Sequence, residues 1–187
     1  MGKESVAFLE IEHKFVVDDS FDLDDFCARC RKLGPVNEKA LGVKDTYYVP
    51  ANESELIYRH RLDKEIQQLT LKSRGGDNEV RTEINLDLGA GRSQASEVEA
   101  WMEAIGALPG FGIQKHIHVF DFPDCEVVHY EASHAGRSIC CVEFEAKKVN
   151  DEEAGLAVLI RYERLLGFEN LEREKINLFD LLVTRHS

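Results

Sequence analysis

Two short acidic motifs at opposite ends of the chain have the spacing of metal ligands. Glu10 and Glu12 form one Glu-x-Glu pair, and Glu143 and Glu145 form another. Residues i and i+2 of a β-strand point to the same face, about 7 Å apart, so each pair presents two carboxylates to one side. Carboxylates that converge from neighbouring strands bind hard cations such as Mg²⁺ or Mn²⁺ rather than Zn²⁺.

Basic residues follow the same alternation in the segments between these two motifs. Arg59 shares a face with Arg61, and Arg81 shares a face with Glu83 and Asn85. Arginine and lysine side chains offer several N–H donors that match phosphate oxygens. Acids and bases on one set of strand faces therefore predict a ligand that satisfies both, namely a polyphosphate with a divalent cation.

The elements that must position these residues follow from hydrophobic periodicity and turn residues. Strands are predicted over 7–16, 44–50, 56–62, 67–74, 79–88, 113–122, 125–132 and 138–147. Helices are predicted over 20–33, 94–107, 151–166 and 172–184.

The charged strand faces decide the architecture. On a single strand, a charged face is usually exposed to water while the apolar face packs on a core. Here five strands repeat the design with both signs of charge, which favours apolar faces packed outward against helices and charged faces turned inward. Eight strands closed into a barrel leave room for side chains or one small ligand. We therefore predict an α+β fold, an eight-stranded antiparallel β-barrel or tunnel with helices packed outside.

Length and composition narrow the class of protein. The chain has 187 residues, which suits one domain over 1–187, with helices of 151–184 packed on the barrel. Its formal net charge of −12 argues against nucleic acid and polybasic membrane contacts as partners. Five cysteines without a secretion signal indicate reduced thiols and a cytoplasmic location. Cys27 and Cys30 share a helix face, which favours buried residues over a metal or redox site.

The order of motifs along the chain resembles the CYTH, or triphosphate tunnel metalloenzyme, family. The opening strand contains the signature Glu-x-Glu-x-Lys at residues 10–14. The motifs that follow in family order are Asp45-Thr46-Tyr47-Tyr48, Arg59-His60-Arg61, Leu69-Thr70-Leu71-Lys72, Arg81-x-Glu83, Lys115 and Glu143-Phe144-Glu145, with Lys175 preceding Phe179 and Leu181-Leu182 in a terminal helix.

This resemblance implies a role for each matching residue. It implies phosphate binding by Lys14, Arg59, Arg61, Lys72, Arg81, Lys115 and Lys175. It implies Mg²⁺ or Mn²⁺ binding by Glu10, Glu12, Glu83, Glu131, Glu143 and Glu145. Glu10, Glu83 and Lys14 would also be catalytic, with the two acids serving a second metal or positioning the attacking water.

The sequence departs from the family pattern at several positions. Asn85 replaces the second acid of the fifth strand, and His116 or His118 would replace a second arginine near Lys115. Ile57 stands where animal thiamine triphosphatases have tryptophan, so no stacking aromatic for an organic group is evident.

The leading functional hypothesis is metal-dependent hydrolysis of inorganic triphosphate to pyrophosphate and phosphate, by a monomer or homodimer acting on a small-molecule triphosphate. A class IV adenylate cyclase or a thiamine triphosphatase would use the same tunnel. A catalytically silent polyphosphate-binding module is the alternative outside enzymes.

Overall fold

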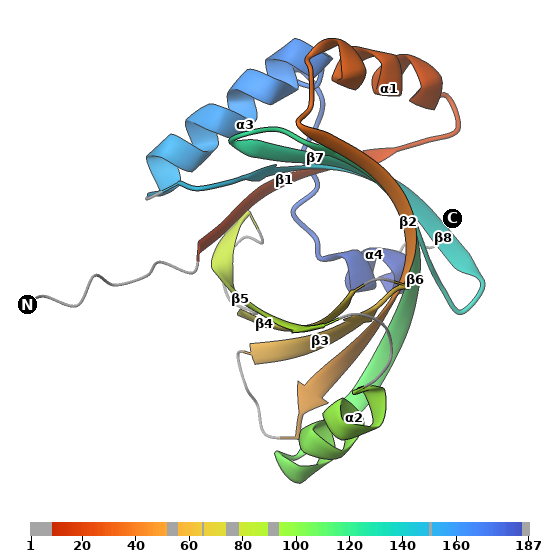
Figure 1. Ribbon diagram of the computed structural model, residues 1–187. Coiled ribbons are helices and arrows are strands. Elements are labelled where there is room, and N and C mark those ends of the chain that lie inside the picture. Colours follow the sequence, from red (N-terminus) through yellow and green to blue (C-terminus); the bar gives the residue numbers. More distant parts are fainter. Residues whose placement is uncertain are drawn as a thin grey trace, which may run out of the picture.

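Eight antiparallel strands close into a barrel in the strand order β1-β5-β4-β3-β2-β6-β7-β8 (Figure 1). The computed structural model describes residues 9–51, 56–64, 66–73, 79–89, 94–149 and 151–184. The predicted α+β barrel is confirmed, although residues 7 and 8 of its expected first strand and residue 74 of its expected fourth strand lie outside the described part.

The bounds of the elements are as follows. The strands are β1 (Leu9–Val17), β2 (Asn37–Pro50), β3 (Leu56–Leu62), β4 (Gln67–Ser73), β5 (Val80–Gly89), β6 (Ala107–Asp121), β7 (Cys125–His134) and β8 (Arg137–Ala146). The helices are α1 (Leu23–Lys32), α2 (Ala95–Ala104), α3 (Glu152–Leu166) and α4 (Leu178–Thr184). None of these described helices combines the length and apolar character needed to cross a membrane.

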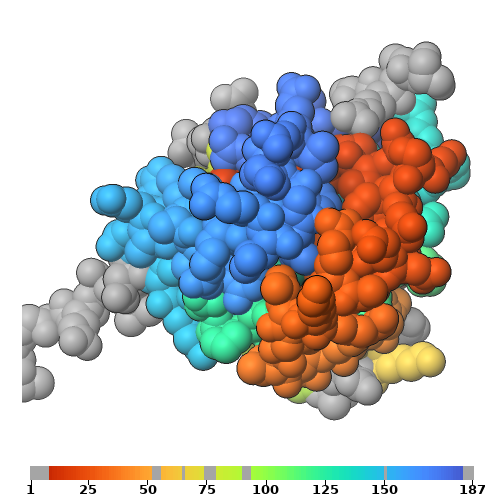
Figure 2. Space-filling view, turned by 90° about the horizontal axis from the view of Figure 1, so that it is seen from above, coloured from red at the N-terminus to blue at the C-terminus, as the bar shows by residue number. Residues whose placement is uncertain are grey.

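The largest apolar core lies outside the barrel, between its strands and the pair α1 and α3 (Figure 1). Phe15 and Phe144 point outward from β1 and β8 and meet edge to face, with ring centroids 5.7 Å apart. Phe26 of α1 and Leu159 of α3 are completely buried against them. Seen from above, α1 and α3 lie next to each other over this face (Figure 2). Their packing leaves the opposite faces of the same strands directed into the barrel.

The other two helices occupy different places. On the opposite side of the barrel, α2 buries Val98 and Met102 against the outer face of β2 and β4. In contrast, α4 packs against β8 and places Leu178 and Leu182 among residues of the barrel interior (Figure 1). The helix therefore closes part of the barrel instead of covering its outside.

The largest differences from the predicted boundaries are at the starts of β2, β6 and α4. β2 and β6 pair along their whole length, from Asn37–Asp121 to Pro50–Ala107, so each begins six or seven residues earlier than predicted. Glycine and proline in these extensions have low strand propensity, and the partner strand compensates for it. α4 begins at Leu178 instead of residue 172, because the Asn177 side chain accepts a hydrogen bond from the Asp180 backbone N–H and caps the helix there.

Candidate functional site

The barrel encloses a cavity of about 820 Å³ that is lined by residues from all eight strands and from α4. Strand alternation turns most of the predicted site residues into it, as the sequence pattern required. The predicted residues that line the cavity are Glu10, Glu12, Lys14, Arg59, Arg61, Lys72, Arg81, Glu83, Lys115, Glu143 and Glu145. The structure thus brings together charges that are up to 135 residues apart in the chain.

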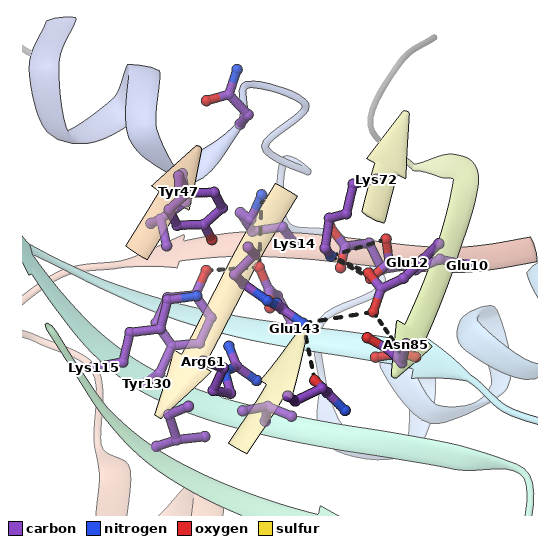
Figure 3. Close-up of a pocket in the computed structure, with 18 of the residues that line it drawn as sticks. Glu10, Glu12, Lys14, Tyr47, Arg61, Lys72, Asn85, Lys115, Tyr130 and Glu143 are labelled. Atoms are coloured by element: carbon purple, nitrogen blue, oxygen red, sulfur yellow. Dashed lines mark hydrogen bonds and ion pairs between the residues drawn. The ribbon is translucent and has the colours of Figure 1, made fainter. Parts of the chain in front are cut away.

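The densest group of charges lies where β1, β5 and β4 meet. Lys72 donates a 2.9 Å hydrogen bond to Glu10 and also contacts Glu83. Arg81 contacts Glu10 and donates a 2.8 Å hydrogen bond to Glu12. Figure 3 shows Glu10, Glu12 and Lys72 together on one side of the pocket. Two cations are therefore shared among three carboxylates at this corner.

Glu10 and Glu12 differ in protonation although they are two residues apart. Burial alone would raise the pKa of Glu10, but the charges of Lys72 and Arg81 outweigh burial and hold that pKa well below its usual value. Burial and the charge of Glu10 together raise the pKa of Glu12 to about 7. The neighbouring cations and acids thus shift the pKa values of these two carboxyls in opposite directions.

A second ion cluster joins β2, β3 and β6 around Asp45. This carboxylate is fully buried and accepts two 2.8 Å hydrogen bonds from the Arg61 guanidinium. Lys115 Nζ lies 3.4 Å from the same carboxylate. Burial would raise the pKa of Asp45, but the charges of Arg61 and Lys115 hold it far below its usual range. Asp45 therefore fixes two cations that face the cavity.

Sequence reasoning did not select Asp45 as a site residue, although it quoted the surrounding motif. The alternation of β2 contained the signal, because Asp45 shares its face with Tyr47, which lines the cavity. Tyr48 points the other way into the core beneath α2, as the alternation requires.

Lys14 lies between the two charge clusters and links β1 to β8. Its Nζ is 3.7 Å from Glu143 Oε1 and donates a 3.4 Å hydrogen bond to the Ile176 carbonyl oxygen. The Tyr130 hydroxyl donates a 2.7 Å hydrogen bond to the same Glu143 oxygen (Figure 3). Burial opposes ionisation of Glu143, but the charges of Lys14 and Lys115 outweigh it and lower the pKa of that carboxyl.

Arg59 is a buried cation with one unused donor. Its Nη2 donates a 3.0 Å hydrogen bond to Thr70 and lies 3.7 Å from Glu83. Within the described part of the chain, its Nε has no hydrogen-bond acceptor. Since an unsatisfied buried donor is costly, an anion in the cavity would stabilise this arrangement.

Glu145 and Glu126 form a contrasting pair of acids. They are register partners on β8 and β7, and Glu12 of β1 is the partner of Glu145 on its other side. No hydrogen bond or ion pair to the Glu126 or Glu145 carboxylate forms among residues of the described ranges. Burial and the neighbouring acids, first Glu10 and then Glu126, raise the pKa of Glu145 well above its usual value. Sequence reasoning missed Glu126, because β7 carries apolar residues on both faces.

This acidic side of the cavity has donor chemistry that fits a divalent cation. Glu12, Glu143 and Glu145 come from adjacent strands and supply the hard oxygen ligands that Mg²⁺ and Mn²⁺ prefer. Glu126 adds a fourth carboxylate beside Glu145. In the part of the chain that the structure describes, no three acid, histidine or cysteine side chains already converge as a metal site.

Two predicted site residues lie outside the cavity. Glu131 is exposed on the outer face of β7, because its neighbours Tyr130 and Ala132 face inward. Lys175 precedes α4, is half-exposed and pairs with Glu79 at 3.0 Å. Their placement corrects the expectation that Glu131 contributes a metal ligand and Lys175 grips the phosphate.

The two β6 histidines also point away from the cavity. His116 is exposed, and His118 lies 2.8 Å from Glu38 on the outer surface. The inward position near Lys115 belongs to Ile117. The expectation that a histidine replaces a second arginine is therefore wrong, because the strand alternation places both imidazoles on the opposite face.

Comparisons with known proteins agree with this architecture. No family model matches the sequence, and no curated protein matches it. Among solved structures, the PH1012 protein of Pyrococcus horikoshii OT3 has a TM-score of 0.73 and 18% identity, over 92% of this chain and 99% of that chain. The comparison shows a shared fold.

Two further structures with this fold have names that mention nucleotide or phosphate chemistry. A candidate adenylate cyclase from Vibrio parahaemolyticus has a TM-score of 0.71 and 14% identity, over 96% of this chain and 100% of that chain. A candidate adenylyl cyclase from Hippeastrum, with a dominant triphosphatase activity, has a TM-score of 0.62 and 14% identity, over 94% and 95% of the two chains.

Proposed function

We propose that the protein is a hydrolase that cleaves a linear triphosphate with the help of a bound divalent cation. The observation that carries the proposal is one enclosed cavity that is lined by six of the predicted phosphate-binding cations and by five of the predicted acidic ligands. The named activities of the structural neighbours in Vibrio parahaemolyticus and Hippeastrum belong to the same area of chemistry. They support the triphosphate class but not a particular substrate.

The cations provide the phosphate-binding surface. Arg61 and Lys115 are held in place by Asp45, so little side-chain entropy is lost when they contact an anion. Arg59 offers its unused Nε, and Lys14 stands beside Glu143 in the middle of the cavity. Lys72 and Arg81 complete this proposed set at the β1–β5–β4 corner.

The acids have two roles in this proposal. Glu12, Glu143 and Glu145 would hold Mg²⁺ or Mn²⁺, with Glu126 beside them. When bound, such a cation neutralises phosphate charge and lowers the pKa of a coordinated water. Glu10 and Glu83 flank Lys72 and would position the attacking water. Charge on the transferred phosphoryl group is stabilised by fixed cations, which is the main source of rate in such reactions.

The identity of the triphosphate is a separate question. Inorganic triphosphate was the sequence prediction, on the ground that no stacking aromatic was evident. The structure removes that ground, because Tyr47, Phe111 and Phe179 line the cavity together. The choice between a bare and an organic triphosphate then depends on which of them fits the apolar part of the cavity lining.

The test is phosphate release from inorganic triphosphate, thiamine triphosphate and ATP, with and without Mg²⁺ or Mn²⁺. We expect release from at least one substrate, and only when metal is present. Cyclic AMP as the main product from ATP would contradict the hydrolase assignment and indicate a cyclase. Binding without turnover of any substrate would indicate a silent binding module.

A matched pair of variants connects the activity to this cavity. Glu143→Gln removes an inward carboxylate and is expected to lower kcat on the order of 10²-fold or more. Glu131→Gln makes the same change on the outer face of β7 and should leave activity unchanged. Equal activity of the two variants would show that the proposed site is wrong.

A further inference from the structure

The cavity has two chemically different walls. The inner faces of β1, β3, β4, β5 and β8 carry most of its charges. The inner faces of β2, β6 and β7 include three charged lining residues, Lys39, Lys115 and Glu126, but are mostly apolar. The aliphatic and aromatic residues of this second wall are Leu41, Tyr47, Val49, Phe111, Ile117, Val119, Val128 and Tyr130.

Four aliphatic side chains form a continuous patch on the second wall. Ile117 of β6 is the register partner of Leu41 on β2. Two residues further along the same face, Val119 is the partner of Val128 on β7. Directly paired side chains on one face are in contact distance, so the four form one patch, with Lys39 beside Val119 and Glu143 beside Val128 at its edges. We call Leu41, Ile117, Val119 and Val128 the aliphatic patch.

Three aromatic rings lie at the α4 end of this wall, about 20 Å along β2 and β6 from the aliphatic patch and separated from it by the Asp45 and Lys115 positions. The rings of Tyr47 and Phe111 are stacked with centroids 4.7 Å apart, and those of Phe111 and Phe179 with centroids 3.6 Å apart. All three residues line the cavity, and Figure 3 shows Tyr47 across the pocket from Glu10 and Glu12. The Nζ of Lys115 lies over the Tyr130 ring, 5.0 Å from its centroid.

A bare triphosphate would contact only the charged part of this cavity favourably. Its charged oxygens point in all directions, and those directed at the aliphatic patch would lose water without gaining a hydrogen-bond donor. The cavity volume of about 820 Å³ also lies toward the upper end of the roughly 300–1,000 Å³ typical of organic-ligand pockets. A ligand with a phosphate chain on one side and a flat apolar group on the other matches both walls.

We infer that the second wall is the binding site for a planar organic group, so that the substrate is a ring-bearing triphosphate ester instead of inorganic triphosphate. The inference rests on the proposed function and specifies its substrate class. The triphosphate lies against the cations of the first wall and Lys115, and the ring lies against the aliphatic patch. The residues that test this contact are Ile117 of β6 and Val128 of β7.

The experiment measures ligand affinity by calorimetry in EDTA, so that no turnover interferes. The probes are inorganic triphosphate, methyl triphosphate, ATP and thiamine triphosphate. We expect ATP or thiamine triphosphate to bind at least about tenfold more tightly than inorganic triphosphate. Methyl triphosphate, which has no ring, should bind about as tightly as inorganic triphosphate. Inorganic triphosphate that binds as tightly as, or more tightly than, both ring-bearing ligands would overturn the inference.

Variants locate the effect on the second wall. Ile117→Lys should weaken the preferred ring-bearing ligand at least about tenfold and tighten inorganic triphosphate, because it exchanges an apolar contact for a cation. Leu108→Lys makes a comparable change at an exposed position of the same strand and should alter neither affinity. Val128→Thr keeps the side-chain shape but adds a hydroxyl, so it should weaken the binding of only the ring-bearing ligand. This variant provides the test if Ile117→Lys does not fold. Unchanged preference in a folded Ile117→Lys or Val128→Thr variant would contradict the inference.

Hydrolysis separates this inference from the proposed function. Metal-dependent cleavage with inorganic triphosphate as the best substrate would overturn the inference and keep the function. Absence of metal-dependent cleavage for every triphosphate would overturn the function itself.

Discussion

Asp45 and Glu145 are acids on the inner face of the same barrel with opposite electrostatic surroundings. Asp45 receives two hydrogen bonds from Arg61 and has Lys115 at 3.4 Å, and its pKa is strongly lowered. Glu145 has acids on both neighbouring strands, and its pKa is strongly raised. A carboxylate satisfied within the fold serves to position cations, whereas one without a cation is suited to a positively charged ligand.

The largest effect that this comparison predicts is on catalysis. Glu145→Gln should reduce metal-dependent phosphate release on the order of 10²-fold, because it removes a proposed metal ligand. Steady-state assays over a range of Mg²⁺ concentrations would measure the loss, with Glu169→Gln on the exposed surface as the control. Full activity in Glu145→Gln would show that the unpaired acid has no part in the reaction.

The next effect separates the two acids by stability. Asp45→Asn leaves Arg61 and Lys115 without their shared carboxylate. It should cost roughly 2–3 kcal/mol in the free energy of unfolding at pH 7, less than a fully buried pair because Arg61 is partly exposed. Glu145→Gln should instead stabilise the metal-free protein slightly. Urea denaturation measures the free energy of unfolding of both variants. A destabilisation of similar size in the two would contradict the predicted difference between Asp45 and Glu145.

The pH dependence of stability sharpens the comparison. The lowered pKa of Asp45 means that the unfolded chain takes up this proton first, so its stabilising contribution is lost as pH falls below about 4. The raised pKa of Glu145 means that the unfolded chain ionises first, so stability falls as pH rises above about 4.5. Thermal melts over a range of pH should show that Asp45→Asn reduces the loss of stability below about pH 4. Glu145→Gln should reduce the loss of stability above about pH 4.5. Parallel curves for wild type and both variants would contradict these assignments.

A smaller effect is expected for the cation between the two regions. Lys14→Ala should weaken binding of a triphosphate about tenfold at low salt, since it removes a buried ammonium next to Glu143. The difference from wild type should shrink as salt is added, as for a charge contact. Calorimetry at two ionic strengths measures it, with Lys148→Ala at an exposed position as the control. A loss of affinity that does not depend on salt would point to a structural defect instead.

Strand alternation explains how much of this site the sequence could predict. Polar and apolar residues alternate cleanly around Glu10, Arg59, Arg81 and Glu143, so the inward face of each strand was identifiable. On β7 both faces carry apolar residues, and the pattern could not choose between Glu126 and Glu131.

Long-range pairing accounts for the remaining differences. The aromatic wall depends on the register of β2 with β6, which places Phe111 beside Tyr47, and on the position of α4. Neither register nor helix docking is encoded in local periodicity. The position of Lys175 was missed for the same reason, because Asn177 starts the helix later than the apolar pattern indicated.

The most direct test of the proposed metal-dependent triphosphatase is the rate of phosphate release from the best triphosphate substrate as Mg²⁺ or Mn²⁺ is titrated into the EDTA-treated protein. The arrangement of inward-facing acids opposite fixed cations predicts no release without metal and a saturable rise as metal is added. Release that proceeds at the full rate in EDTA would contradict it.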